Sequence, residues 1–269
     1  MRRAAPPAPG WPPALRQLLR SGGELALDRR LDALYQRLPA TTCQRQGHCC
    51  SLLPPLQPAE ILAWLIRLAQ SPDPERSETA AGLARHFLLN AAQRLACPWA
   101  LPGACADYAH RFLACRAYGL WSRETYQERR QAAQAGQAAV AAAWAGLGVR
   151  LPDEVLAPGP EYCPHVRLCD NEEKRPRLDN RLRALEEAMS LAALDLAESG
   201  LDALGGDLAH LVARLALGER ECLEAKVAVT RAWLAGRWTE AEEMVAQAQE
   251  QARAWARAAP TDWGLFTQT

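Results

Sequence analysis

The chain has 269 residues, 49% of them hydrophobic, which is enough to bury a sizeable core. Its 31 Lys and Arg balance 31 Asp and Glu, so the formal net charge of zero indicates neither a nucleic-acid partner nor an anionic membrane surface. We found no apolar run of bilayer-spanning length and no secretion signal in the first ten residues, so we predict a cytoplasmic protein without a membrane partner. In a reducing compartment, its nine cysteines favour metal ligation over disulfides.

Two short helices are predicted before the first cysteines. Residues 1–13 contain five prolines and are expected to form a disordered leader. Leucines at helical spacing follow over residues 15–38, broken by Gly22 and Gly23, which divides the segment into two helices.

The first cysteine window covers residues 42–50 and contains Cys43, Cys49 and Cys50. Polar residues and Gly47 separate these thiols, so the window is predicted as a loop that can fold several sulfurs back onto one point. Adjacent cysteines rarely bridge each other, which favours two separate ligands at Cys49 and Cys50.

A helical pair is predicted to bring the second window back to the first. Pro58 and Glu60 mark the start of a helix over 59–70, because proline suits the first turn and a carboxylate suits the positive end of the helix dipole. A turn at 71–74 and a second helix to residue 96 follow. Such a pair returns Cys97 toward Cys50.

The second window, residues 97–116, contains Cys97, Cys105 and Cys115, so six of the nine cysteines fall in two short stretches. A helix is predicted over residues 108–145, followed by an irregular stretch over 146–176 that is rich in Pro and Gly. This stretch carries Cys163 and Cys169, for which ligation is favoured over a role as buried structural thiols.

The ordered windows resemble the cysteine-cluster proteins of the YkgJ type, which are regarded as zinc or iron chelators. The likeness is carried by Cys43, Gly47, Cys49-Cys50, Glu60, Cys97-Pro98-Trp99, Cys105-Ala-Asp-Tyr108 and Cys115-Arg116, and it covers roughly the middle third of the chain. Gln46 stands where the family has its second cysteine, and Arg111-Phe112 replaces Arg-Pro. The resemblance implies a metal site, and we predict that Cys163 or Cys169 replaces the ligand missing at Gln46.

The metal is predicted to be an iron–sulfur cluster, with 4Fe-4S favoured and Zn²⁺ as the alternative. Thiolates suit both, but the ligands are spread over distant loops and form no compact Cys-x-x-Cys knuckle. The predicted metal ligands are Cys43, Cys49, Cys50, Cys97, Cys105, Cys115, Cys163 and Cys169. Several thiolates around a metal need nearby cations, and Arg45, Arg111, Arg116 and Arg167 could supply them.

The remainder of the chain is predicted to be helical. Residues 177–259 form a helical bundle with a face for a protein partner, Cys222 is a small core residue there, and residues 260–269 are a tail. Alanine and leucine dominate, and no segment has the pattern of a strand. The fold class is therefore all-α, with a cysteine-cluster domain over residues 14–176.

Two classes of function stay open from the sequence. The first is a metal-binding or electron-transfer module. The second is a metal-dependent enzyme, because a flagellin lysine N-methylase shares this kind of cysteine cluster. The chain has no Gly-rich nucleotide loop and no His-Glu-x-x-His, so the first class is favoured.

Overall fold

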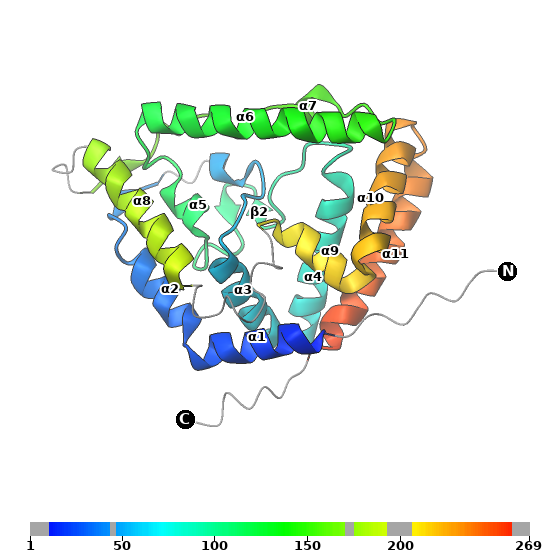
Figure 1. The fold of residues 1–269 in the computed structure, drawn as a ribbon, viewed down its shortest axis with the longest axis horizontal. Helices are drawn as coiled ribbons and strands as arrows, with labels where there is room; N and C mark the ends of the chain where they lie inside the picture. Colours follow the sequence, from blue (N-terminus) through cyan, green and yellow to red (C-terminus); the bar gives the residue numbers. More distant parts are fainter. Residues whose placement is uncertain (1–10, 44–46, 170–174, 193–205, 260–269) are drawn as a thin grey trace. The chain divides into compact units, whose positions relative to one another are not determined.

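The computed structural model describes residues 11–43, 47–169, 175–192 and 206–259. It is mostly helical, which confirms the all-α prediction (Figure 1). The α-helices are α1 Pro13–Glu24, α2 Leu27–Tyr35, α3 Pro58–Gln70, α4 Asp73–Leu89, α5 Leu113–Ala117, α6 Arg123–Gly146, α7 Asp153–Leu156, α8 Arg175–Ala192, α9 Leu208–Leu217, α10 Glu219–Leu234 and α11 Trp238–Arg257.

Among the described residues, four two-residue strands and one 3-10 turn also form, so the prediction that no segment forms a strand was wrong. They are β1 Thr41–Thr42, β2 Ala100–Leu101, β3 Ala104–Cys105, β4 Arg167–Leu168 and the turn η1 His48–Cys50. β1 pairs antiparallel with β4, and β2 with β3. All of them lie within or beside the cysteine loops. Their pairing satisfies backbone N–H and C=O groups that have no helical hydrogen bond there.

The chain divides into two compact units. Unit 1 consists of residues 1–26, 61–92 and 196–269, and unit 2 of residues 27–60 and 93–195. The boundary expected at residue 176 coincides with none of the four points at which the chain passes from one unit to the other. The reason is that α4, although it lies between the two cysteine windows in sequence, packs with the C-terminal helices α9, α10 and α11.

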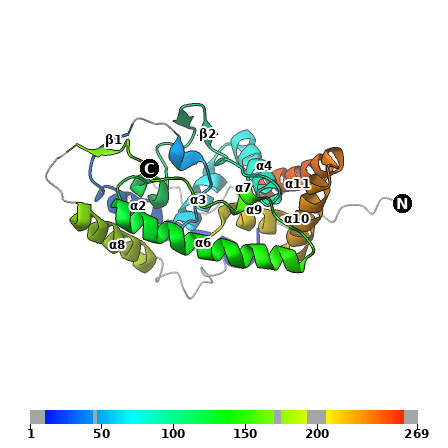
Figure 2. The same ribbon diagram turned by 90° about the horizontal axis from the view of Figure 1, so that it is seen from above.

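Unit 1 is a helical bundle in which α4 packs along α11, with α9 and α10 beside them (Figures 1 and 2). Small buried residues such as Ala84 on α4 and Ala252 on α11 let these helices approach closely. The Trp255 ring stacks on that of Trp11 with centroids 4.6 Å apart, and Trp11 Nε1 donates to the Trp255 carbonyl at 3.1 Å.

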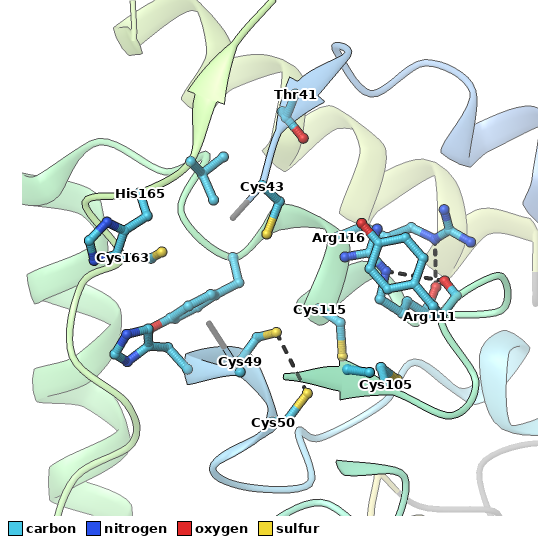
Figure 3. Close-up of a pocket in the computed structure, with 16 residues that line it drawn as sticks. Thr41, Cys43, Cys49, Cys50, Cys105, Arg111, Cys115, Arg116, Cys163 and His165 are labelled. Carbon is cyan, nitrogen blue, oxygen red and sulfur yellow. Dashed lines mark hydrogen bonds between the residues drawn. The ribbon is translucent and has the colours of Figure 1, made fainter. Parts of the chain in front are cut away.

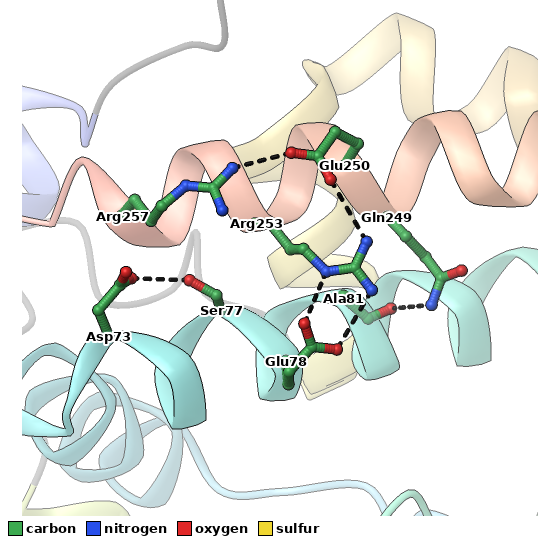
Figure 4. A network of polar contacts seen from close by, with 8 residues as sticks. All are labelled: Asp73, Ser77, Glu78, Ala81, Gln249, Glu250, Arg253 and Arg257. Atoms are coloured by element: carbon green, nitrogen blue, oxygen red, sulfur yellow. Dashed lines mark hydrogen bonds and ion pairs between the residues drawn. The ribbon is translucent and has the colours of Figure 1, made fainter.

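Polar contacts run along the solvent side of the α4–α11 pair (Figure 4). Arg253 on α11 donates to both carboxylate oxygens of Glu78 on α4, at 2.8 and 3.2 Å, and Arg257 donates to Glu250 at 2.8 Å. Exposed ion pairs contribute little free energy. The Arg253–Glu78 pair joins the two helices and bears on their register more than on the stability of the bundle, whereas the Arg257–Glu250 pair lies within α11.

Unit 2 has a helical frame around its loops. α2 lies beside α8 (Figure 1), and the first turn of α6 is fixed by Asp179 of α8. The Asp179 carboxylate accepts the Ser122 N–H at 2.8 Å and the hydroxyl groups of Ser122 and Thr125 at 2.6 and 2.7 Å. Within the described ranges, no helix combines the length and the apolar character that crossing a membrane requires.

Candidate metal centre

A cavity of about 90 Å³ in unit 2 collects thiols from three separate stretches of the chain. Figure 3 shows the sulfur atoms of Cys49, Cys50 and Cys115 directed toward a common region. The cysteines that line the cavity are Cys43, Cys49, Cys50, Cys105, Cys115 and Cys163. The cavity thus joins thiols from both cysteine windows and from the later irregular stretch.

The first window turns at Gly47, whose φ of 74° places it in the left-handed region. A residue with a side chain would be strained in that backbone conformation, even though the space around the position is open. The turn η1 begins directly afterwards, and the Cys50 N–H donates to the Gly47 carbonyl at 2.8 Å. It brings the Cys49 and Cys50 sulfur atoms to 3.9 Å from each other.

The second window is fixed to the first by a backbone hydrogen bond. The Cys97 N–H donates to the Cys50 carbonyl at 2.8 Å, which confirms the predicted return of Cys97 to Cys50. The chain then turns through the β2–β3 hairpin, in which Ala100 is paired with Cys105. This hairpin presents the Cys105 thiol to the cavity.

The third stretch reaches the cavity through the β1–β4 pair. Thr41 pairs with Leu168 and Thr42 with Arg167, just before Cys43 and just after Cys163 in the chain. Gly119 lets this stretch approach, because a Cβ there would lie 2.7 Å from a Val166 side-chain atom and 3.2 Å from Cys163 Cβ. A larger residue at position 119 would therefore displace Cys163.

Burial makes four thiols of the two windows poor acids while no cation is bound. It raises the pKa of Cys50 to about 12 and that of Cys97 to about 11, and it raises the pKa values of Cys49 and Cys115. Neighbouring thiolates raise them further, since each would repel the next. A cation among the sulfurs would reverse this repulsion, because it would stabilise several thiolates at once.

Two of the four predicted arginine cations line the cavity. Arg111 Nε donates to the Tyr108 carbonyl at 3.2 Å, and Arg116 Nη2 donates to the Ala109 carbonyl at 2.6 Å. The Arg116 guanidinium also lies 4.4 Å from the centroid of the Tyr35 ring. Arg167 is on β4 and does not line the cavity, and Arg45 lies outside the described residues.

Glu60 connects the start of α3 to the elements that carry the cysteines. Its buried carboxylate accepts the Tyr35 hydroxyl at 2.6 Å, the Leu113 N–H at 2.6 Å and the Gln57 N–H at 3.1 Å. The sequence singled out Glu60 as a helix-start residue. The structure gives it a wider role, because Leu113 begins the helix α5 that contains Cys115.

We expect Glu60→Gln to lower the free energy of unfolding by about 3 kcal/mol, since one amide NH₂ would face backbone and hydroxyl donors and leave them unsatisfied. Urea unfolding followed by far-ultraviolet circular dichroism measures the change. Glu128→Gln is the matched control, because Glu128 is exposed on α6 and its loss should change stability by less than about 0.5 kcal/mol. Equal effects of the two substitutions would contradict the role of Glu60.

Two predicted ligands do not line the cavity. Cys97 lies beside it, close enough for its thiol to interact with those of Cys50, Cys105 and Cys115, whereas Cys169 is exposed with its N–H donating to the Ala40 carbonyl at 2.9 Å. Cys222 is buried on α10 of unit 1, as expected for a core residue. Gln46 falls outside the described residues, so its replacement by another ligand stays a prediction.

The sequence did not identify Tyr118 or Gly119 as part of the site. Tyr118 lines the cavity, and its hydroxyl donates to the Glu161 carbonyl, which ties α5 to the stretch before Cys163. The Tyr-Gly pair after Cys115-Arg116 is a local sign of a turn, but nothing nearby in sequence indicates its contact with residues 161–166.

The thiol and imidazole groups of the cavity suit a soft metal ion, but they do not form a complete coordination shell. Among the residues that the structure describes, no three His, Cys, Asp or Glu side chains are arranged as ligands of one ion. The cavity therefore supplies thiols, two histidines and two arginines without a complete coordination shell. No family model, no curated protein and no solved structure matches the chain.

Proposed function

We propose that unit 2 holds a metal centre through its cysteine thiols and that the protein serves as a metal-binding or electron-transfer module. The observation that carries this proposal is the meeting, in one cavity, of six cysteines from three separate stretches of the chain. The raised pKa values keep these thiols protonated while no cation is bound, and a cation that displaced their protons would gain several thiolate ligands at once. Metal ligation would explain why thiols from three separate stretches meet in one cavity.

The donor set favours an iron–sulfur cluster, with 4Fe-4S as the first choice and Zn²⁺ as the alternative. Thiolate-rich loops without compact knuckles are more typical of clusters than of structural zinc modules. The cluster and its thiolates carry negative charge, and Arg111 and Arg116 provide positive charge at the cavity wall. When bound, an iron–sulfur cluster would supply one-electron chemistry, whereas zinc would stabilise the loops.

Elemental analysis of anaerobically purified protein tests the proposal. We expect iron and acid-labile sulfide at stoichiometric levels, together with visible absorption that bleaches on reduction. Zinc at stoichiometric levels without sulfide would replace the cluster by the alternative. Less than about 0.1 metal ion per chain after reconstitution under anaerobic conditions with iron and sulfide, and separately with zinc, would overturn the proposal.

The C-terminal helices are proposed to contact a protein partner. Three large apolar side chains are exposed on α10 and α11, namely those of Leu223, Leu234 and Trp238, and Trp238 is 62% exposed. A partner would cover these side chains and remove their apolar surface from water. On this proposal, the protein brings its metal centre to another protein in a reducing compartment.

A further inference from the structure

A second cavity, of about 700 Å³, lies beside the thiol cavity in unit 2. We call it the basic groove. The side chains that define it are Arg94, Arg123, Arg130, His48, His165 and Tyr162. Its volume lies in the range of sites for small organic ligands.

The charge of the groove is positive. Three guanidinium groups line it, and Glu161 is the single carboxylate among its lining residues. Arginine presents a planar fork of donors that matches phosphate oxygens, and low-dielectric walls strengthen such contacts. The groove therefore favours an anion with several oxygen acceptors.

Two buried polar atoms of the lining have no partner within the described residues. They are Nε of Arg130 and Oγ of Ser51, both fully shielded from solvent. Buried donors are normally satisfied. Because neither atom is open to solvent, a ligand oxygen in the groove could reach one only if its side chain rotated.

The backbone on one side of the groove is held in place by hydrogen bonds. Arg94 Nη1 donates to the carbonyls of Ala157 and Pro158 at 3.5 Å, and the Tyr126 hydroxyl donates to the Pro160 carbonyl at 2.6 Å. Prolines restrict the same stretch further. The groove is thus formed before a ligand arrives, which reduces the entropy cost of binding.

Two histidines separate the groove from the thiols. The rings of His48 and His165 stack with centroids 5.9 Å apart and planes 16° from parallel, and both line the thiol cavity as well as the groove. A molecule in the groove would therefore reach the wall of the thiol cavity. This places the ligand next to any centre that the thiols hold.

We propose that the basic groove binds a small phosphorylated molecule that has a flat apolar part. Its phosphate is held by Arg123 and Arg130, and its flat part packs on Tyr162, whose ring centroid lies 5.9 Å from the Arg123 guanidinium carbon. Arg94 is a positioning residue, because its donors hold the backbone. The inference goes beyond the proposed metal centre, since no cysteine lines the groove.

Isothermal titration of the purified protein tests the assignment with three probes: phenyl phosphate, inorganic phosphate and benzoate. We expect phenyl phosphate to bind most tightly, because it has both the dianion and the ring, and we expect its affinity to fall as salt is raised. Arg130→Gln should weaken phenyl phosphate binding by at least about tenfold. Arg150→Gln, which removes an exposed arginine of the same unit outside the groove, should leave it unchanged.

A second variant separates the two halves of the ligand. Tyr162→Leu should weaken phenyl phosphate binding but leave inorganic phosphate binding unchanged, and circular dichroism verifies that each variant is folded. Three results would overturn the inference: no heat with phenyl phosphate at millimolar concentration, equal affinity for benzoate, or an equal loss in Arg150→Gln. The protein is titrated as purified and its metal content is measured in the same sample, so that absence of the metal centre and absence of phosphate binding are distinguished.

Discussion

Cys49→Ser and Cys115→Ser are expected to remove stoichiometric metal from the protein, because each deletes a thiol that lines the central cavity. Metal per chain, measured by elemental analysis after anaerobic purification, should fall by at least about tenfold in both variants. Cys222→Ser is the matched control. Its thiol is equally lost, but it lies in the core of unit 1, so metal content should stay at the wild-type level.

The same measurement distinguishes the two cysteines of the third stretch. Cys163 lines the cavity and Cys169 is exposed outside it, so Cys163→Ser should lower metal content while Cys169→Ser retains most of it. Metal loss in Cys222→Ser equal to that in Cys115→Ser would show that the centre has been assigned to the wrong residues.

Complete metal removal is expected to unfold the loops of unit 2 and to leave unit 1 folded. The cysteine loops have two-residue strands and short turns in place of long helices, so ligation supplies much of their folding free energy, on the order of 10 kcal/mol in small zinc modules. Unit 1 has a buried helical core around Trp255 and carries no predicted ligand. It does not need the metal.

Hydrogen exchange measured with and without a chelator resolves the two units. Amides over residues 97–119 should lose protection by about a hundredfold or more, in accord with the free energy that ligation supplies. Amides of α11 should exchange at the same rate in both samples. Unchanged protection throughout unit 2 after verified metal removal would contradict the dependence on metal.

The helical part of the fold was predictable because it depends on local pattern. The Pro58 and Glu60 signals mark the start of α3 to within one residue, and the turn before α4 follows from the prolines at 72 and 74. The end of α4 was less accurate. The helix stops at Leu89 and not near residue 96, and a less regular turn carries the chain to Cys97.

The site was predictable in composition but only partly in geometry. The clustering of cysteines identified the windows, and the turn at Gly47 with the return of Cys97 follows from local residues. The β1–β4 pair does not follow from local residues, because its two strands have two residues each and are separated by more than a hundred positions. The pair leaves no periodic pattern in either segment, and neither does the approach of Cys163 to Gly119.

The division into units was unpredictable for a related reason. Periodicity could not show which distant helix covers α4, because consecutive residues such as Ala80-Ala81 and Phe87-Leu88 are buried on different sides of the helix. Residues 61–92 join the C-terminal helices, so the cysteine windows on either side of them belong to one unit while the segment between them belongs to the other.

That interleaving sets an order of events on the ribosome. Every residue that lines the thiol cavity has been synthesised by residue 166, whereas α9 to α11, which complete the bundle around α4, come afterwards. Domains fold as their residues emerge, at about 5–20 residues per second. The nascent chain therefore has all its cavity cysteines for several seconds during which α4 still lacks its helical neighbours.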